Sequence, residues 1–234
     1  MLAKNSAASL IAVVALALGI GVCTVMYSIV YGCLLRGLPV EGSDRIMYLQ
    51  ETNVSQNVER VSVPLHDYLD WRAQQTSFEQ LGAYYFGTVN ISGKDRPERF
   101  GGAFVTANTL DILGVRPLLG RLFLDGEDHP ASEPVVVLGF SVWRDRYDSD
   151  PEILGKTIRA NGLQTTVVGI MPEGFEFPGF QKLWLPIRVD PLEIDRREGA
   201  GLTVFGRLHQ DVSLNEARVE LTSIAARLES AFFG

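Results

Sequence analysis

Two short motifs resemble sites for phosphate binding and for nucleophilic catalysis, and neither is complete. Gly155-Lys156-Thr157 matches the end of a phosphate-binding loop, but that loop also needs a glycine at position 150, where this chain has Asp150. A carboxylate there repels phosphate, and the tripeptide leads into a predicted strand rather than a helix. We therefore expect no nucleotide site at this position.

The second motif, Gly139-Phe140-Ser141-Val142-Trp143, follows an apolar strand as a nucleophile elbow does. The elbow needs a glycine at its end for close packing, and Trp143 occupies that place. The sequence favours Ser141 as the cap of a short helix whose core face carries Val142, Trp143 and Tyr147. A membrane-anchored hydrolase is the least favoured alternative, since it would require Ser141 beside a histidine.

The histidines and the acidic cluster do not match a metal-binding pattern. His66, His129 and His209 are far apart and have neither a His-x-x-x-His spacing nor a cysteine partner. The acidic residues between positions 125 and 128 lack the glycine and glutamate of a calcium-binding loop, so they predict an exposed acidic turn. The sequence thus predicts no catalytic, cofactor-binding or metal-binding residue.

The longest uncharged stretch lies near the amino terminus. Residues 5–35, between Lys4 and Arg36, contain no charged side chain. A bilayer core of about 30 Å needs roughly 20 apolar residues in a helix, so this stretch is long enough to span it. A cleaved signal peptide, whose apolar core is about 7–15 residues, and a lipid-modified cysteine both fit less well. We expect a tail and one transmembrane helix in residues 1–35, followed by a domain over residues 36–234.

Small residues recur every four positions in the apolar stretch. Ala15 is spaced from Gly19, and Ala17 from Gly21, as in helices that approach each other closely. The general frequency of Gly and Ala in membrane helices explains the pattern equally well. These four residues are our candidates for helix–helix packing.

Charge excludes one class of partner. The chain has 21 Lys and Arg against 28 Asp and Glu, a formal net charge of −7. Every acidic residue follows the apolar stretch, and the basic residues are scattered, whereas nucleic-acid binding needs clustered Lys and Arg. We expect no nucleic-acid partner. Both cysteines, Cys23 and Cys33, lie in the apolar stretch, so the following domain has no disulfide.

The domain has the pattern of an α+β fold that is rich in hairpins. An alternation of apolar with polar or small residues predicts a strand from 84 onward, and further strands are predicted at 45–51, 99–106, 135–138, 156–160, 163–171 and 202–208. Helices are predicted just after Pro64, from Ser77 and over 108–113. Residues 52–59 and 93–95 are predicted as loop and turn.

The clearest local signals are one turn and one helix start. Asn161-Gly162 suits a two-residue hairpin turn, because both positions need positive φ. Ser213 and Glu216 form a capping box, and the helix behind it must pack its apolar face, most simply on the strand just before it. That face comprises Leu214, Ala217, Leu221, Ile224, Ala225 and Leu228.

An ordered set of short segments runs through nearly the whole chain. The segments are Leu18-Gly19-Ile20-Gly21, Leu34-Leu35-Arg36, Asp67 to Arg72, Leu113 to Pro117, Leu154 to Ile158, Val167 to Pro172, Trp184-Leu185-Pro186 and Arg207-Leu208. In this order they resemble the first membrane helix and the periplasmic core domain of MacB-like ABC transporter permeases of the FtsX family. The resemblance is strongest to the large, duplicated permeases that lack a fused ATPase. Val22-Cys23 and Gly37 depart from the usual family residues.

The resemblance implies an architecture. It implies a porter-like α/β part formed by residues 36–83 with 200–234, and a β-rich inserted part formed by residues 84–199. The family continues into further membrane helices, so we expect this chain, which stops at Gly234, to be a fragment or a truncated product. The implied location is the bacterial inner membrane, with the large domain in the periplasm.

The resemblance also implies a function. This is a permease component without ATPase activity of its own, whose domain transmits ATP-driven motion to export a drug, peptide or lipoprotein. The implied partners are the lipid bilayer, a separate ABC ATPase subunit and a second permease copy. A membrane-anchored binding module that works without an ATPase is the main alternative. No substrate contact is singled out, and apolar and aromatic residues between the two parts are the default lining of any pocket.

Overall fold

The computed structural model describes residues 16–17, 19–21, 24, 43–53, 58–93, 96–196 and 198–233. The chain divides into two compact units, Met1–Ser43 and Asp44–Gly234. In the first unit Ala17, Gly19 and Gly21 are helical and exposed, whereas Ala15 lies outside the described residues. Among the helices whose residues are described, none is both long and apolar enough to cross a bilayer.

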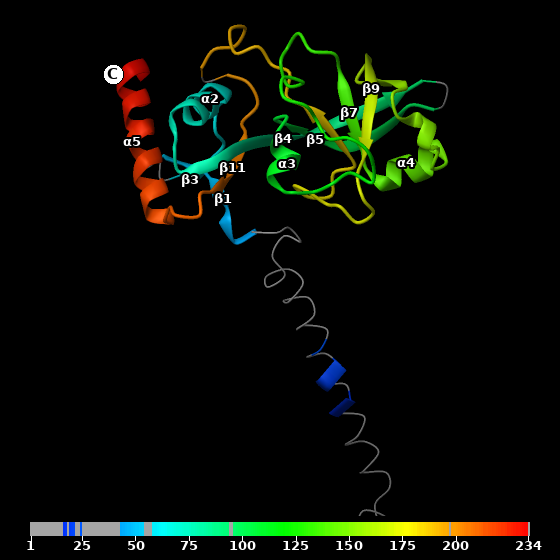
Figure 1. The fold of residues 1–234 in the computed structure, drawn as a ribbon, viewed down its shortest axis with the longest axis horizontal. Coiled ribbons are helices and arrows are strands. Elements are labelled where there is room, and N and C mark those ends of the chain that lie inside the picture. Colours follow the sequence, from blue (N-terminus) through cyan, green and yellow to red (C-terminus); the bar gives the residue numbers. More distant parts are fainter. Residues whose placement is uncertain are drawn as a thin grey trace, which may run out of the picture. The chain divides into compact units, whose positions relative to one another are not determined.

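The second unit is a mixed α/β fold, drawn in Figure 1. Its strands are β1 (Ile46–Leu49), β2 (Glu51–Asn53), β3 (Val58–Val61), β4 (Phe78–Ser92), β5 (Glu98–Val105), β6 (Leu119–Gly120), β7 (Val135–Leu138), β8 (Thr157–Ala160), β9 (Leu163–Ile170), β10 (Leu183–Pro186) and β11 (Thr203–Leu208). Its helices are α2 (Leu65–Gln74), α3 (Thr109–Ile112), α4 (Phe140–Tyr147) and α5 (Leu214–Phe233), with 3-10 turns η3 (Ser43–Arg45) and η5 (Pro151–Ile153).

One long strand, β4, takes part in two different arrangements. Its first half pairs with β11, which in turn pairs with β1, and this forms the open part of the sheet. Pairing also runs from β4 through β5, β10, β7, β9 and β8 and returns to β4 at Ile91 and Ser92, so these strands close into a ring. In Figure 1, β4 extends from the side that carries α2 and α5 toward the side that carries β7 and β9.

Each end of β4 contributes to its own hydrophobic core. Leu81 and Ala83 lie in a core that also includes residues of α2 and α5. Val89 and Ile91, on the same face of the strand, lie in a second core with the ring strands and α4. Alternation of side chains along a strand explains this, because residues two apart share a face. From Leu81 to Ile91, one face of β4 is therefore covered by two different sets of elements.

Phe104 of β5 joins the two cores. Its ring packs against both of them and stacks on Tyr85, with ring centroids 4.8 Å apart and an interplanar angle of 6°. The residue opposite it on β4 is Tyr85, and two positions further along β4, at Gly87, a Cβ atom would lie 2.6 Å from the Phe104 ring. The missing side chain at Gly87 leaves the space that this ring fills.

Several predicted elements are confirmed. The strand at 135–138 has the predicted bounds, and the hairpin of β8 and β9 turns at Asn161 and Gly162, whose φ angles are 49° and 83°. Asp150 caps η5 by accepting a hydrogen bond from the backbone N–H of Glu152 at 2.8 Å. Gly114, with φ 65°, follows the short helix α3, which lies within the predicted range 108–113.

Other predictions are wrong. Ser77 begins no helix, since β4 starts at Phe78, and the region predicted as loop over 52–59 contains parts of β2 and β3. Residues 54–57 and Lys94-Asp95 lie outside the described residues. The expected boundary between the two parts, at residues 83 and 84, falls inside β4. The division into a porter-like and an inserted part stays a prediction.

The ring has one position where any side chain would meet backbone. A Cβ atom at Gly169 of β9 would lie 2.2 Å from the carbonyl oxygen of Arg121. Gly169→Ala should lower the free energy of unfolding by about 1–3 kcal/mol, because backbone must move to admit the methyl group. Gly101→Ala in β5 is the matched control, since nothing lies within 4 Å of its Cβ position. Denaturant unfolding followed by circular dichroism measures both, and equal losses in the two variants would contradict the prediction.

Candidate interaction surfaces

Helix α5 begins at the predicted capping box. The backbone N–H and the hydroxyl of Ser213 donate to Glu216 Oε2 at 2.8 and 2.7 Å. Further along, Ala217 and Ile224 are buried, with Leu221 and Leu228 packed partly against the same core. The prediction was wrong for the other two residues of the face, because Leu214 and Ala225 are exposed. The buried face is a narrow stripe at the spacing 217, 221, 224 and 228.

The principal neighbour of α5 is α2, rather than the preceding strand as predicted. Arg227 Nη2 on α5 donates to Gln74 Oε1 on α2 at 3.1 Å. Next to this contact, the Glu220 carboxylate accepts hydrogen bonds from the backbone N–H groups of Thr76 and Ser77 at 2.8 and 3.0 Å, and from their hydroxyls at 2.7 and 2.5 Å. Glu220 thereby joins α5 to the loop between α2 and β4.

The environment of Glu220 changes its ionisation. Burial raises the pKa of this carboxyl, but the hydrogen bonds from Ser77 and Thr76 favour the charged form and outweigh burial, so the pKa is lowered. The carboxylate is therefore charged at neutral pH and satisfied by four donors. Charge-assisted hydrogen bonds of this kind are stronger than neutral ones.

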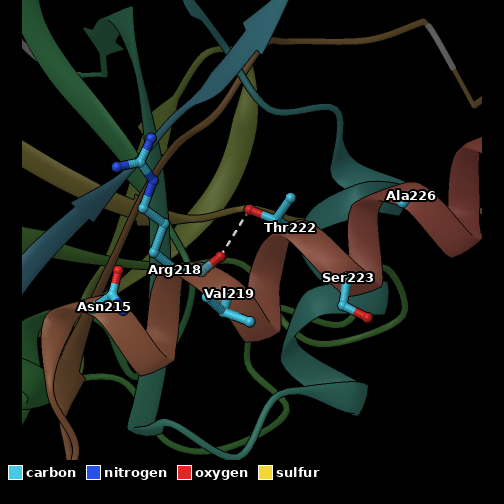
Figure 2. A pocket seen from close by; sticks show the side chains of 6 residues that line it. All are labelled: Asn215, Arg218, Val219, Thr222, Ser223 and Ala226. Carbon is cyan, nitrogen blue, oxygen red and sulfur yellow. Dashed lines mark hydrogen bonds between the residues drawn. The ribbon is translucent and has the colours of Figure 1, made fainter.

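The outer face of α5 forms a shallow groove, shown in Figure 2. Val219, whose surface is 62 % exposed, lies between side chains that are small or polar. Thr222 Oγ1 donates to the backbone carbonyl of Arg218 at 2.8 Å, which directs this hydroxyl into its own helix. The six lining residues include a single charged side chain, Arg218, and two apolar ones, Val219 and Ala226. They are Asn215, Arg218, Val219, Thr222, Ser223 and Ala226.

A second surface lies on the face of the sheet that points away from α2 and α5. Tyr84 is buried there and contacts the rings of Phe86, Phe177 and Phe205, with centroids 5.5, 5.5 and 6.2 Å away. At its margin Tyr48 and Phe86 are 51 % and 56 % exposed. Burial, together with a hydrogen bond to Tyr48, raises the pKa of the Tyr84 phenol well above its usual value. This aromatic surface can offer apolar contact and neutral hydroxyl groups.

The residues of the nucleophile-elbow motif have structural roles. Ser141 lies in the first turn of α4, whose N-cap is Gly139, and no side chain caps this helix, so the predicted capping role of Ser141 is wrong. The helix starts two residues earlier than a Ser141 cap would place it, because the Gly139 carbonyl already accepts the backbone N–H of Trp143 at 3.1 Å. The predicted core face is confirmed: Val142 and Trp143 are buried and Tyr147 packs on the same core.

The three histidines lie on separate elements. His66 on α2 places Nε2 2.9 Å from the carbonyl oxygen of Pro191, and His129 Nδ1 accepts the backbone N–H of Ala131 at 3.3 Å. His209 follows β11, where its backbone N–H donates to the carbonyl of the residue before β4 at 3.0 Å. Within the described part of the chain, no group of three or more His, Cys, Asp or Glu side chains is placed to hold a metal ion.

The acidic residues at 125–128 form a turn, as predicted, but two of them have partners. Glu127 accepts two hydrogen bonds from the Arg121 guanidinium at 2.7 and 2.9 Å, and Asp128 accepts the backbone N–H of Ala107 at 3.0 Å. Burial raises the pKa of Glu127, and the hydrogen bonds from Arg121 and Leu124 lower it below its usual value overall. These carboxylates connect loops to one another.

The Gly155-Lys156-Thr157 motif leads into strand β8, as predicted. Gly155 takes a positive φ of 76° in the turn before the strand. Lys156 Nζ lies 3.3 Å from Asp150 Oδ2 and 3.7 Å from Glu152 Oε2. The lysine is paired with the carboxylates that follow α4, and its position in a strand turn differs from the helix start of a phosphate-binding loop.

Comparison with protein families gives one match that covers most of the chain. The model of the MacB-like periplasmic core domain matches residues 9–224. This range includes part of the apolar stretch, the whole of the ring and the first half of α5. The comparison with curated protein sequences finds no significant match.

Solved structures share the fold. The periplasmic region of MacB from Actinobacillus actinomycetemcomitans is 18 % identical, with a TM-score of 0.61, covering 85 % of this chain and 88 % of that one. A domain of a putative permease protein from Porphyromonas gingivalis is 17 % identical, with a TM-score of 0.62, covering 80 % and 86 %. The extracellular domain of the noncanonic ABC-type transporter YknZ from Gram-positive bacteria is 14 % identical, with a TM-score of 0.54, covering 80 % and 92 %.

The contact of α5 with the loop before β4 should be sensitive to acid. The pKa of Glu220 is lower in the folded state than in the unfolded state. The carboxylate therefore stabilises the fold fully when the pH is above its pKa in the unfolded state, and this stabilisation is lost as the pH falls through its pKa in the folded state. Glu220→Gln should cost about 1.5–3 kcal/mol at pH 7 and flatten this part of the pH dependence. Glu229→Gln, on the exposed side of the same helix, is the control. Urea unfolding between pH 7 and pH 3 measures both, and parallel pH profiles for Glu220→Gln and the unmodified chain would contradict the assignment.

Proposed function

This chain belongs to the family of MacB-like periplasmic core domains, and we propose that it forms the anchored, extracytoplasmic part of an ABC transporter permease. In this proposal the apolar stretch at residues 5–35 spans the inner membrane once, and the second unit lies in the periplasm. ATP is hydrolysed on a separate cytoplasmic subunit. The domain then transmits the resulting motion to expel a drug, a peptide or a lipoprotein.

The extent of the family match carries this proposal. The match starts at residue 9, inside the apolar stretch, and continues to residue 224 in α5, so that stretch and the following domain belong to one family unit. A helix of roughly 20 apolar residues crosses a bilayer, and the stretch has more than that number without a charge. Proteins of this family are generally permease components without catalysis of their own. The charged groups of Glu127 and Lys156 are paired within the domain, with Arg121 and Asp150.

The build of the domain suits a moving part. The strand β4 belongs both to the open sheet beneath α2 and α5 and to the closed ring, so a displacement of one end is passed to the other through continuous backbone. The stacked pair of Tyr85 and Phe104 fills the junction between the two cores. Close packing resists compression, which lets the domain move as a body.

The aromatic surface favours a second candidate function. Tyr48 and Phe86 are large, half-exposed aromatic side chains on one sheet face, and such residues are enriched where proteins bind partners. A membrane-anchored module that binds its partner there, without an ATPase, would have the same fold. The two candidates differ in whether an ATPase subunit is bound.

Membrane topology is the first expected outcome. With Cys23 and Cys33 replaced by Ser, Ser223→Cys on the outer face of α5 should react with a membrane-impermeant maleimide in intact cells whose outer membrane is permeabilised. Ala3→Cys, before the apolar stretch, should react only after the inner membrane is disrupted. Labelling of both positions or of neither in intact inner membranes, or the reverse pattern, would contradict the proposed orientation.

The ATPase partner is the second expected outcome. The full-length chain purified from its native membrane in mild detergent should carry an ABC ATPase subunit and hydrolyse ATP, and the activity should disappear when the Walker lysine of that subunit is replaced. Crosslinking in intact membranes before solubilisation controls for loss of a weak partner. Two results together would support the binding module instead. The chain would crosslink to no ATPase, and its Tyr48→Ser and Phe86→Ser variants would lose a bound partner.

A further inference from the structure

The connection between β10 and β11 crosses over α2. We call residues 190–196 the strap. At its start the carbonyl oxygen of Pro191 lies 2.9 Å from His66 Nε2 on α2. At its end the Arg196 guanidinium forms ion pairs with two carboxylates of the same helix, Asp67 at 2.9 Å and Asp70. The strap is thus held to α2 at both ends.

Arg196 also contacts the last turn of α5. Its guanidinium carbon lies 3.9 Å from the centroid of the Phe232 ring. The side chains of Arg196, Asp67 and Asp70 are 16 %, 17 % and 31 % exposed, so the charged group is largely withdrawn from water between carboxylates and ring. A cation over an aromatic face is attracted by the ring, and the attraction grows when water is excluded.

The last turn of α5 has few other contacts. Leu228 is the last residue of α5 that packs against the hydrophobic core, and the Ser230 hydroxyl bonds back within the helix to the carbonyl of Arg227 at 3.0 Å. Phe232 is 55 % exposed. Among the described residues, the ring contact with Arg196 is the side-chain interaction that attaches this turn to the rest of the domain.

We propose that Arg196 is a latch that fixes the last turn of α5 to the strap and to α2, and that this turn and the strap open together when the latch is released. The earlier part of α5 stays in place, because Glu220, Ala217 and Ile224 hold it independently. When the contact of Arg196 is lost, α5 up to Leu228 therefore stays in place, and the turn after Leu228 becomes free. This inference goes beyond the proposed transport function and does not depend on it.

The chemistry of the latch requires arginine. A planar guanidinium can pair with carboxylates along its edge while its face lies on an aromatic ring, whereas a lysine ammonium is a compact point charge that cannot do both well. Salt screens partly buried ion pairs less than exposed ones. The guanidinium makes two separate contacts, one with the carboxylates and one with the aromatic ring, and each contact can be removed by its own substitution.

Hydrogen exchange of the full chain in detergent micelles, read by mass spectrometry, tests the latch. In Arg196→Ala, amides of both the strap and residues 229–233 should exchange about five- to thirtyfold faster, as expected when a local opening loses the stability of one such contact. Peptides of β7 and β9 should be unchanged. Arg196→Lys should keep part of the protection of the strap and lose that of the last turn.

Two further variants separate a latch from a general loss of stability. Phe232→Leu should speed exchange at residues 229–233 alone, because the carboxylates still hold Arg196. Arg227→Ala, which removes another arginine bridging α5 and α2, should leave the strap unchanged. The proposal is overturned if Arg196→Ala affects the strap only, if every peptide of the domain accelerates equally, or if the last turn already exchanges without protection in the unmodified chain.

Discussion

The fold of this domain depends on one strand being buried along the same face by two separate cores. Strand β4 supplies Leu81 and Ala83 to the core under α2 and α5, and Val89 and Ile91 to the core of the ring. Neither core could lose its half of β4 without exposing a row of apolar side chains. At the junction, Phe104 stacks on Tyr85 and fills the space left by Gly87. This contact makes one continuous unit of an open sheet and a closed ring.

Local rules in the sequence accounted for the parts of the fold that are decided locally. The Asn161-Gly162 turn and the Ser213–Glu216 capping box follow from backbone dihedral angles and from hydrogen bonds between near neighbours, so a single stretch of sequence is enough to predict them. Ser77 shows the limit of the same reasoning. Serine often begins helices, but the N–H and hydroxyl of Ser77 donate hydrogen bonds to Glu220, which lies 143 positions away.

The surfaces were harder to predict than the elements. The helical spacing of α5 was right, yet Leu214 is exposed, since the helix meets α2 along a narrow stripe whose width depends on the neighbouring helix. The exposure of Tyr48 and Phe86 depends on which strands pair and where the pairing stops, and this is set by partners far along the chain. The MacB-like resemblance was read correctly because it rests on the order of many segments, none of which is decisive by itself.

The pairing of β4 with β11 has a consequence for the way the chain is made. About 110 residues separate the end of β4 from the start of β11. A ribosome adding about 5–20 residues per second needs roughly 5 to 20 s to bridge that interval. During this time the edge of β4 that β11 will cover has no strand beside it, and unpaired strand edges promote association between chains. Until β11 pairs with this edge, a newly made chain is exposed to the association that chaperones counteract.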